Sequence, residues 1–394
     1  MSAHGFTVQG DVCPFIPVFG APQVMFVHGE GTQLWDDTGK RYLDFLSGLA
    51  VTSLGHSNPA IAEAICEQAK TLMHVSNFFS NPVATQAAQM VNALMFEATG
   101  LTGQTFFCNS GAEANEAALK LARKFGGRGR HVVVSAYGSF HGRTLAALAA
   151  TGQPAKHEPF FPMPDGFRHV AFGDIDALRG AIDPTVSAVL IETVQGEGGV
   201  VPASTGYLRA IRDLCDERGM LMMIDEVQTG FARTGRWFGF EHHGVLPDVV
   251  TMAKAMGNGF PVGAMWARRD VASSFQPGDH GSTYSGTAIA TAAVRAVINE
   301  MRRIDAPAMC TEKGTYLTAK LAALPGVHSV RGQGLLIAVE LGEGADAKSA
   351  YTELLARGLV TNAVTATALR LAPPITVSYA EIDEAVALIA EVVA

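Results

Sequence analysis

Two side chains with complementary chemistry stand at the ends of two short apolar runs. Asp225 directly follows the run Leu221–Ile224, and Lys254 comes shortly after the run Asp248–Met252. Both runs have the length and composition of buried strands. In open α/β sheets, ligands bind at the edge where such strands end. The acid and the amine are therefore candidates for one site.

A carboxylate and a lone lysine at one sheet edge suit an enzyme that uses pyridoxal phosphate. The lysine amine forms a Schiff base with the aldehyde of this cofactor, and the carboxylate keeps the pyridine nitrogen protonated so that the ring accepts electrons. A salt bridge at the strand ends, or two solvated charges, explains Asp225 and Lys254 equally well when they are taken alone.

A candidate phosphate site lies where the chain turns tightly into a strong helical pattern. Asn109 or Ser110 can cap this helix, and Gly111 allows close approach to the backbone. Free N–H groups at a helix start hold a phosphate dianion, although an ordinary capped helix is the alternative. The sequence lacks the glycine patterns of dinucleotide-binding and ATP-binding loops, which removes the usual support for those cofactors.

Two further stretches bring polar or aromatic groups to predicted strand ends. Phe140 can stack on a planar ring and Arg143 can grip a carboxylate, although a core position and a solvated surface are the alternatives. We interpret His141 as a structural residue. The stretch Glu192–Gly199 holds two acids and several glycines, which indicates either a polar pocket or a simple glycine turn.

The composition predicts a compact soluble protein of about two domains. The chain has 394 residues, of which 48% are hydrophobic and 17% charged, and its net charge of −8 argues against a nucleic-acid or membrane surface. There is no apolar run of membrane-spanning length and no signal core at the N-terminus. Five widely spaced cysteines favour reduced thiols in the cytoplasm and argue against a metal site.

Strand-like runs alternate with helical patterns through the middle of the chain. This alternation predicts an α/β fold with a mostly parallel central sheet flanked by helices. The main predicted strands are Thr105–Cys108, His131–Ser135, Ala188–Ile191, Leu221–Ile224 and Asp248–Met252.

The ends of the chain differ from its centre. Asp-Thr-Gly39 predicts the turn of a hairpin, and helices are predicted from Asn58-Pro59 onward, over Pro82–Thr99 and over Ile382–Val393. We expect a large α/β domain over residues 59–290. Residues 1–58 and 291–394 together form the predicted small α+β domain, in which Gly334–Leu341 begins a strand.

Taken in order, these motifs resemble the class III, or ornithine-type, aminotransferases of pyridoxal phosphate fold type I. The resemblance covers nearly the whole chain and implies a large cofactor-binding domain with a small domain from both chain ends. The motifs that carry it are Gly29-Glu-Gly-Thr-Gln-Leu-Trp-Asp, Asn109-Ser-Gly-Ala-Glu-Ala-Asn-Glu, Phe140-His-Gly-Arg-Thr-Leu, Gln195-Gly-Glu-Gly-Gly, Asp225-Glu-Val-Gln-Thr-Gly, Lys254 with its glycines, His280-Gly-Ser-Thr and Ala368-Leu-Arg-Leu-Ala-Pro-Pro.

The resemblance implies a role for each residue of the cofactor site. Lys254 would carry pyridoxal phosphate and move the proton, Asp225 would pair with the pyridine nitrogen, and Gln228 would reach the ring hydroxyl. Val227 and Phe140 would lie on the two faces of the ring.

The phosphate site and the assembly are implied in the same way. Gly111 and Ala112 would cradle the phosphate, and Thr283 would complete that site from the neighbouring subunit. This contribution implies an obligate homodimer with shared active sites. The expected ligands are small amino acids and 2-oxo acids, with no nucleic acid and no membrane as partner.

Substrate recognition would depend on two arginines. Arg143, with Ser282 nearby, would hold the α-carboxylate of an acylated ornithine, and Arg370 would take the α-carboxylate of glutamate. Glu197 would neutralise Arg370 when the other substrate is present.

The implied reaction is a two-stage exchange between N2-acetyl-L-ornithine and 2-oxoglutarate. It gives N-acetyl-L-glutamate 5-semialdehyde and L-glutamate, a step of arginine biosynthesis. The alternative amine substrates are succinylornithine, ornithine, 4-aminobutyrate and a carrier-bound lysine intermediate. The alternative enzyme class is an intramolecular aminomutase.

Three departures from the family pattern leave every proposed catalytic group in place. Ser285-Gly-Thr-Ala stands where the family usually has Gly-Gly-Asn-Pro, Glu192-Thr replaces Glu-Pro, and His28 stands where Arg is common. The first of these follows Thr283 directly and therefore bears on the phosphate and interface geometry.

Overall fold

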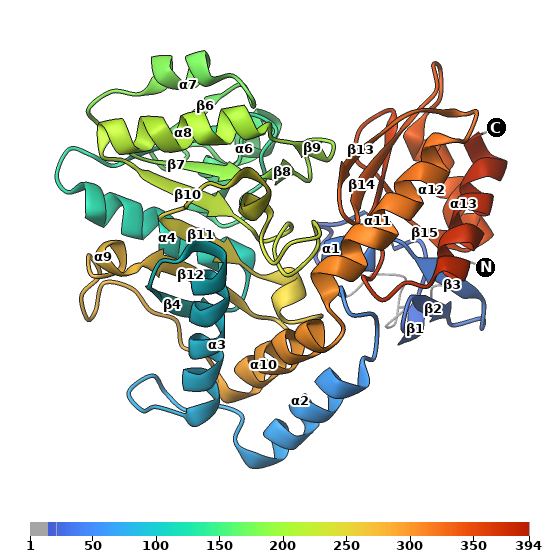
Figure 1. The fold of residues 1–394 in the computed structure, drawn as a ribbon, viewed down its shortest axis with the longest axis horizontal. Helices are drawn as coiled ribbons and strands as arrows, with labels where there is room; N and C mark the ends of the chain where they lie inside the picture. The colour runs from blue at the N-terminus through green and yellow to red at the C-terminus, as the bar shows by residue number, and fades with distance from the viewer. Residues whose placement is uncertain (1–14, 21, 394) are drawn as a thin grey trace.

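The computed structural model describes residues 15–20 and 22–393. A seven-stranded sheet forms the core of the larger of its two parts (Figure 1). Cys13 lies outside the described residues. In spatial order, the strands are β4 (Gly103–Cys108), β12 (Gly263–Arg268), β11 (Val249–Met252), β10 (Leu221–Asp225), β7 (Val186–Glu192), β5 (Val132–Ala136) and β6 (Phe167–Val170).

The sheet is mostly parallel, as predicted. Strands β11, β10, β7, β5 and β6 run in one direction, whereas β12 pairs antiparallel with both β11 and β4. Strands β12 and β6 were not predicted from the sequence. All five strands that were predicted are present, with bounds shifted by one or two residues.

Helices cover both faces of this sheet. Successive residues of a strand point to opposite faces of the sheet, so two adjacent residues pack against helices on different sides. Met223 packs in one apolar cluster with Leu121 of α4, whereas the adjacent Ile224 packs in another with Leu208 of α8. The helices around the sheet are α3 (Pro82–Thr99), α4 (Gly111–Gly126), α5 (Leu145–Ala150), α6 (Pro154–His157), α7 (Ile175–Ala181), α8 (Thr205–Arg218), α9 (Arg269–Ala272) and α10 (Ala288–Arg303).

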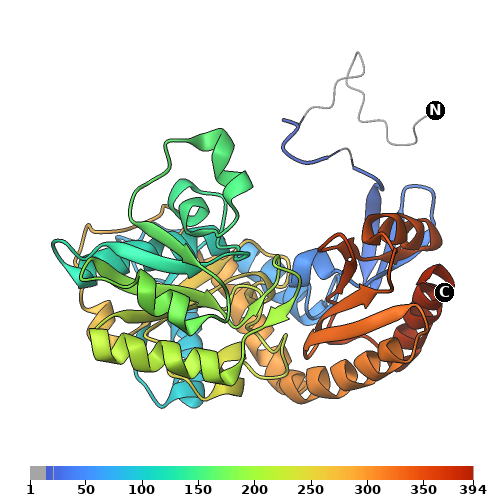
Figure 2. The ribbon, with the colours of Figure 1, turned by 90° about the horizontal axis from the view of Figure 1, so that it is seen from above.

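The two ends of the chain fold together beside the central sheet, where blue and red segments adjoin in Figures 1 and 2. Strand β15 (Leu359–Val360) pairs in parallel with β3 (Arg41–Asp44), which joins the C-terminal part to the N-terminal hairpin. The remaining elements of this part are β1 (Phe26–Glu30), β2 (Gln33–Asp36), β13 (Val327–Gln333), β14 (Leu336–Leu341), β16 (Asn362–Ala363), β17 (Ala368–Leu371), α11 (Ala306–Ala322), α12 (Ala347–Arg357) and α13 (Tyr379–Val393).

Other elements lie between the strands and helices given above. They are α1 (Ser47–Ala50), α2 (Pro59–Thr71), the β8 (Val194–Gln195) and β9 (Val201–Pro202) ribbon, and the single turns η1 (Glu158–Phe160), η2 (Gly239–His243) and η3 (Lys254–Met256). None of the helices in the described ranges is long and apolar enough to cross a membrane. The domain boundaries at residues 59 and 290 stay a prediction.

The local signals in the sequence explain where several elements begin. Asn58 caps α2 by accepting the amide N–H of Ala60, and Asn81 caps α3 by accepting that of Ala84. The predicted hairpin forms from β2 and β3, with Gly39 in the left-handed region at φ 86°. These elements follow from residues close together in the chain.

Candidate active site

Three parallel strands end side by side and bring their last polar residues to one edge. Asp225 is the last residue of β10, and the register places it opposite Glu192 of β7 and Thr251 of β11. Asp225 and Glu192 are both buried. The predicted position of Asp225 at the carboxyl edge of the sheet is confirmed.

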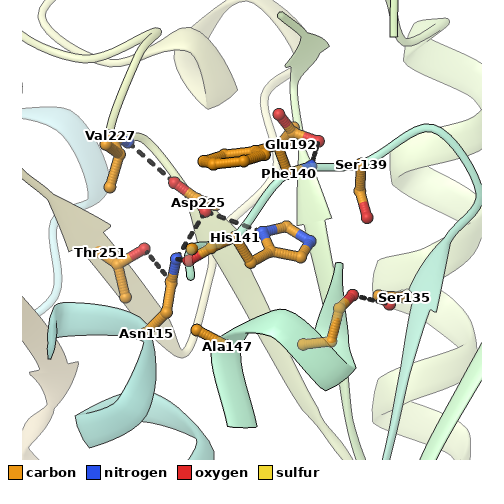
Figure 3. Close-up of polar contacts among 12 residues, drawn as sticks. Asn115, Ser135, Ser139, Phe140, His141, Ala147, Glu192, Asp225, Val227 and Thr251 are labelled. Carbon is orange, nitrogen blue, oxygen red and sulfur yellow. Dashed lines mark hydrogen bonds and ion pairs between the residues drawn. The ribbon is translucent and has the colours of Figure 1, made fainter. Parts of the chain in front are cut away.

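The Asp225 carboxylate is held by three donors (Figure 3). His141 Nδ1 and Asn115 Nδ2 each lie 2.8 Å from Oδ2, and the backbone N–H of Val227 donates to Oδ1 over 3.0 Å. These three contacts fix the orientation of the Asp225 side chain at the end of β10.

Asn115 and Thr251 are site residues that the sequence analysis missed. The amide of Asn115 donates to Asp225 and to the His141 carbonyl oxygen, while its own oxygen accepts a hydrogen bond of 2.8 Å from Thr251. One signal was available, because Asn115 is a polar residue on the buried side of α4, one turn after Gly111. His141, interpreted from sequence as structural, contacts the key carboxylate directly.

Lys254 begins the turn η3, just after β11. Its φ of 49° lies in the left-handed region, which non-glycine residues seldom occupy outside functional sites. Burial, and then the positive charge of Arg370, lower the pKa of Lys254 to about 8, against the opposing effect of Asp225. A lowered pKa makes a larger fraction of the amine neutral and nucleophilic near neutral pH.

The start of α4 has the features of an anion-binding helix N-terminus. Ser110 caps the helix by accepting the Glu113 N–H over 3.2 Å, and the first amides of the helix have no partner within it. A Cβ added at Gly111 would lie 2.7 Å from a methyl group of Val227. The missing side chain lets Val227 pack directly against the start of α4.

A cavity of about 580 Å³ joins these groups. It contains most of the residues that the sequence analysis assigned to the site. The assigned residues that line it are Gly111, Ala112, Phe140, Arg143, Glu197, Asp225, Val227, Gln228 and Lys254.

Arg370 reaches this cavity through Glu197. Its guanidinium lies 2.8 Å from the Glu197 carboxylate and 3.1 Å from the Asn362 side-chain oxygen, with only 2% of the arginine side chain exposed. Although burial acts to raise the pKa of Glu197, the charge of Arg370 lowers it overall. The predicted arginine–glutamate pair therefore forms between β17 and the loop after β8.

Ser282 and Thr283 are not among the residues that line this cavity within the described chain. Ser282 instead lines a second hollow with Asn77 and Phe79, and its hydroxyl accepts a hydrogen bond of 3.3 Å from Asn109. One subunit therefore does not bring Ser282 beside Arg143. The roles assigned to Ser282 and Thr283 stay predictions that need a neighbouring subunit.

The donor set fits pyridoxal phosphate. A nucleophilic amine, a hydrogen-bonded carboxylate, an aromatic face and a helix N-terminus surround one cavity, and each matches one part of that cofactor. Asp225 would hold the pyridine nitrogen, Lys254 the aldehyde carbon, and the first amides of α4 the phosphate.

Residues 19–393 match the model of the aminotransferase class-III family. The chain belongs to the class III aminotransferases. Enzymes of this class depend on pyridoxal phosphate, which agrees with the site geometry.

Relatives of this class III aminotransferase resemble it along nearly its whole length. It is 45% identical to the acetylornithine aminotransferase of Caldanaerobacter subterraneus over 94% of each chain. The N-acetylornithine aminotransferase of Stenotrophomonas maltophilia is 31% identical, with a TM-score of 0.82 and coverage of 94% and 95%.

A third relative carries the cofactor. The ornithine aminotransferase of Toxoplasma gondii, reported with partial occupancy of PLP at the active site, is 30% identical with a TM-score of 0.89 and coverage of 97% and 92%. The fold is thus the pyridoxal phosphate type I fold expected from sequence.

Proposed function

We propose that this enzyme transfers an amino group between N2-acetyl-L-ornithine and 2-oxoglutarate, giving N-acetyl-L-glutamate 5-semialdehyde and L-glutamate. The names of its relatives support this reaction, since two of the three described above act on acetylornithine. In the cell the enzyme would serve arginine biosynthesis in the cytoplasm.

The pairing of Glu197 with Arg370 is the observation that carries this proposal. The same cavity must accept glutamate, which has two carboxylates, and acetylornithine, which has one carboxylate far from its reacting amine. An unpaired buried guanidinium would oppose the second substrate, so Glu197 neutralises it. With glutamate, the substrate α-carboxylate replaces Glu197 on Arg370.

The remaining residues position the reacting atoms. Arg143, exposed at the rim of the cavity, holds the single carboxylate of acetylornithine and so directs the terminal amine inward. Lys254 Nζ takes the proton from the carbon that bears the amine in the first stage, and in the second stage the same nitrogen gives a proton to the corresponding carbon of the other substrate. When bound, pyridoxal phosphate supplies the electron sink that makes this carbon acidic. Gln228 would contact the hydroxyl group of the pyridine ring, and Val227 and Phe140 would lie on the two faces of that ring.

The active site is proposed to be complete only in a homodimer. Thr283 of one protomer would reach the phosphate bound by Gly111 and Ala112 of its partner, and Ser282 would approach the partner's substrate site. Exposed apolar groups support an association, since Phe78 is 93% exposed and Phe79 72% exposed beside the hollow that Ser282 lines.

A substrate panel tests the proposed reaction. The purified holoenzyme is assayed with acetylornithine, succinylornithine, ornithine and 4-aminobutyrate, with and without 2-oxoglutarate. We expect the highest kcat/KM for an N2-acylated ornithine and an absolute need for the oxo acid. A preference for 4-aminobutyrate or ornithine would overturn the substrate assignment, and turnover without 2-oxoglutarate would indicate an aminomutase.

A further inference from the structure

Lys156 places a second cation beside the ring of Phe140. Its Nζ lies 5.2 Å from the centroid of that ring, and the Cζ of Arg143 lies 5.6 Å from the same centroid. Cations are attracted to aromatic faces at such distances. Lys156 belongs to α6, outside every motif used above, and is partly buried.

The ammonium of Lys156 is fixed in place by the loop that carries Phe140. It donates to the Gln153 side-chain oxygen, and the Gln153 amide donates to the Ser139 carbonyl over 2.9 Å. Lys156 is therefore not a freely rotating surface lysine. Gln153 holds it next to the rim of the active-site cavity.

The charge of Lys156 acts on the groups of the substrate site. Burial, and then the nearby charge of Arg143, lower the pKa of Lys156, while Glu197 acts to raise it. Among the described residues, no carboxylate lies within ion-pair distance of Lys156, and Glu197 pairs with Arg370 instead. Arg143 and Lys156 thus place two cations beside the cavity while Glu197 is engaged by Arg370, and this arrangement favours binding of an additional anion.

On the basis of the proposed function, we propose that Lys156 selects N2-acylated ornithines whose acyl group itself ends in a carboxylate. The number of carboxylates leads to this assignment. Arg143 binds the carboxylate that every acylated ornithine carries. The two carboxylates of glutamate bind Arg143 and Arg370. Lys156 is therefore used only by an acylated ornithine whose acyl group carries a second carboxylate.

The test compares two substrates that differ by one carboxylate. The kcat/KM of the holoenzyme is measured for N2-acetyl-L-ornithine and N2-succinyl-L-ornithine in the wild type and in Lys156→Met. A hydrogen bond between two charged groups predicts a loss of roughly tenfold for the succinyl compound, mainly in KM. The values for the acetyl compound and for glutamate should change less than about threefold, because neither uses Lys156.

Two further variants separate charge from structure. Lys156→Arg should restore most of the activity with the succinyl compound. Lys348→Met, which removes an exposed lysine on α12, should leave kcat/KM unchanged for both acyl compounds. Equal loss for both acyl compounds, or no loss for either, overturns the role of Lys156. So does a wild type that uses the acetyl but not the succinyl compound. A wild type that uses neither overturns the proposed function itself.

Discussion

His141 Nδ1 lies 2.8 Å from the carboxylate of Asp225, and both side chains are buried. The two residues are 84 positions apart in the chain. With Asn115, the histidine fixes the orientation of the acid that is proposed to contact the pyridine nitrogen. Groups that orient a functional carboxylate in this way affect activity without touching the substrate.

The His141→Leu substitution should weaken cofactor binding. It removes one of three donors to a buried charge, so the dissociation constant for pyridoxal phosphate should rise by about tenfold or more. Titration of the cofactor-free protein with pyridoxal phosphate, followed by visible absorbance, measures this constant. Far-ultraviolet circular dichroism serves as the control for folding, and an unchanged constant in a folded variant would remove His141 from the site.

Replacement of Lys254 by alanine should abolish turnover. The nucleophilic amine and the proton-transferring group are lost together, so we expect kcat to fall by about 10³-fold or more. Borohydride followed by mass spectrometry should attach the cofactor to wild-type enzyme and not to the variant. Normal turnover in Lys254→Ala would contradict the assignment.

The reaction of the cofactor-free enzyme with pyridoxal phosphate should depend on pH through Lys254. The protonated amine cannot attack an aldehyde, so the rate should rise with pH and level off above about 8, the pKa to which burial lowers this amine. An unperturbed lysine would give a rate that rises to about pH 10.4. Stopped-flow absorbance from pH 6 to 10 checks the profile, and a midpoint near the unperturbed value would be inconsistent with the buried amine.

Glu197→Gln should separate the two substrates. Without its charge, Arg370 stays unneutralised when acetylornithine binds, and we expect kcat/KM for that amine to fall by about tenfold. Glutamate brings its own carboxylate to Arg370, so its half-reaction should change by less than about threefold. Single-turnover rates for each half-reaction measure the ratio, and parallel losses in both would argue against a neutralising role.

Substitution of Gly111 by alanine should reduce cofactor affinity. The added methyl group would lie 2.7 Å from Val227 and would displace it into the space of the ring or phosphate. Gly206 in α8 is a matched control, since nothing lies within 4 Å of the corresponding methyl position. We expect the dissociation constant for pyridoxal phosphate to rise about tenfold in Gly111→Ala and to stay unchanged in Gly206→Ala. Equal affinities in the two variants would exclude close packing at Gly111.

The sequence by itself determined the features that depend on near neighbours. The predicted apolar runs Leu221–Ile224 and Asp248–Met252 form strands β10 and β11, and the caps at Asn58 and Asn81 begin the predicted helices. Periodicity and capping act over a few residues, so they can be read without knowledge of the fold. The ordered motifs, by resemblance, also indicated the family and the cofactor.

Only the tertiary structure decided which distant groups meet. No sequence pattern places Asn115 and His141 on Asp225 rather than in an ordinary core, because their contacts join separate elements of the sheet and helix layers. The antiparallel direction of β12 and the position of Lys156 beside Phe140 likewise became known only from the tertiary structure. Such contacts depend on how β strands pair and how loops pack at their ends, and no local pattern encodes that pairing.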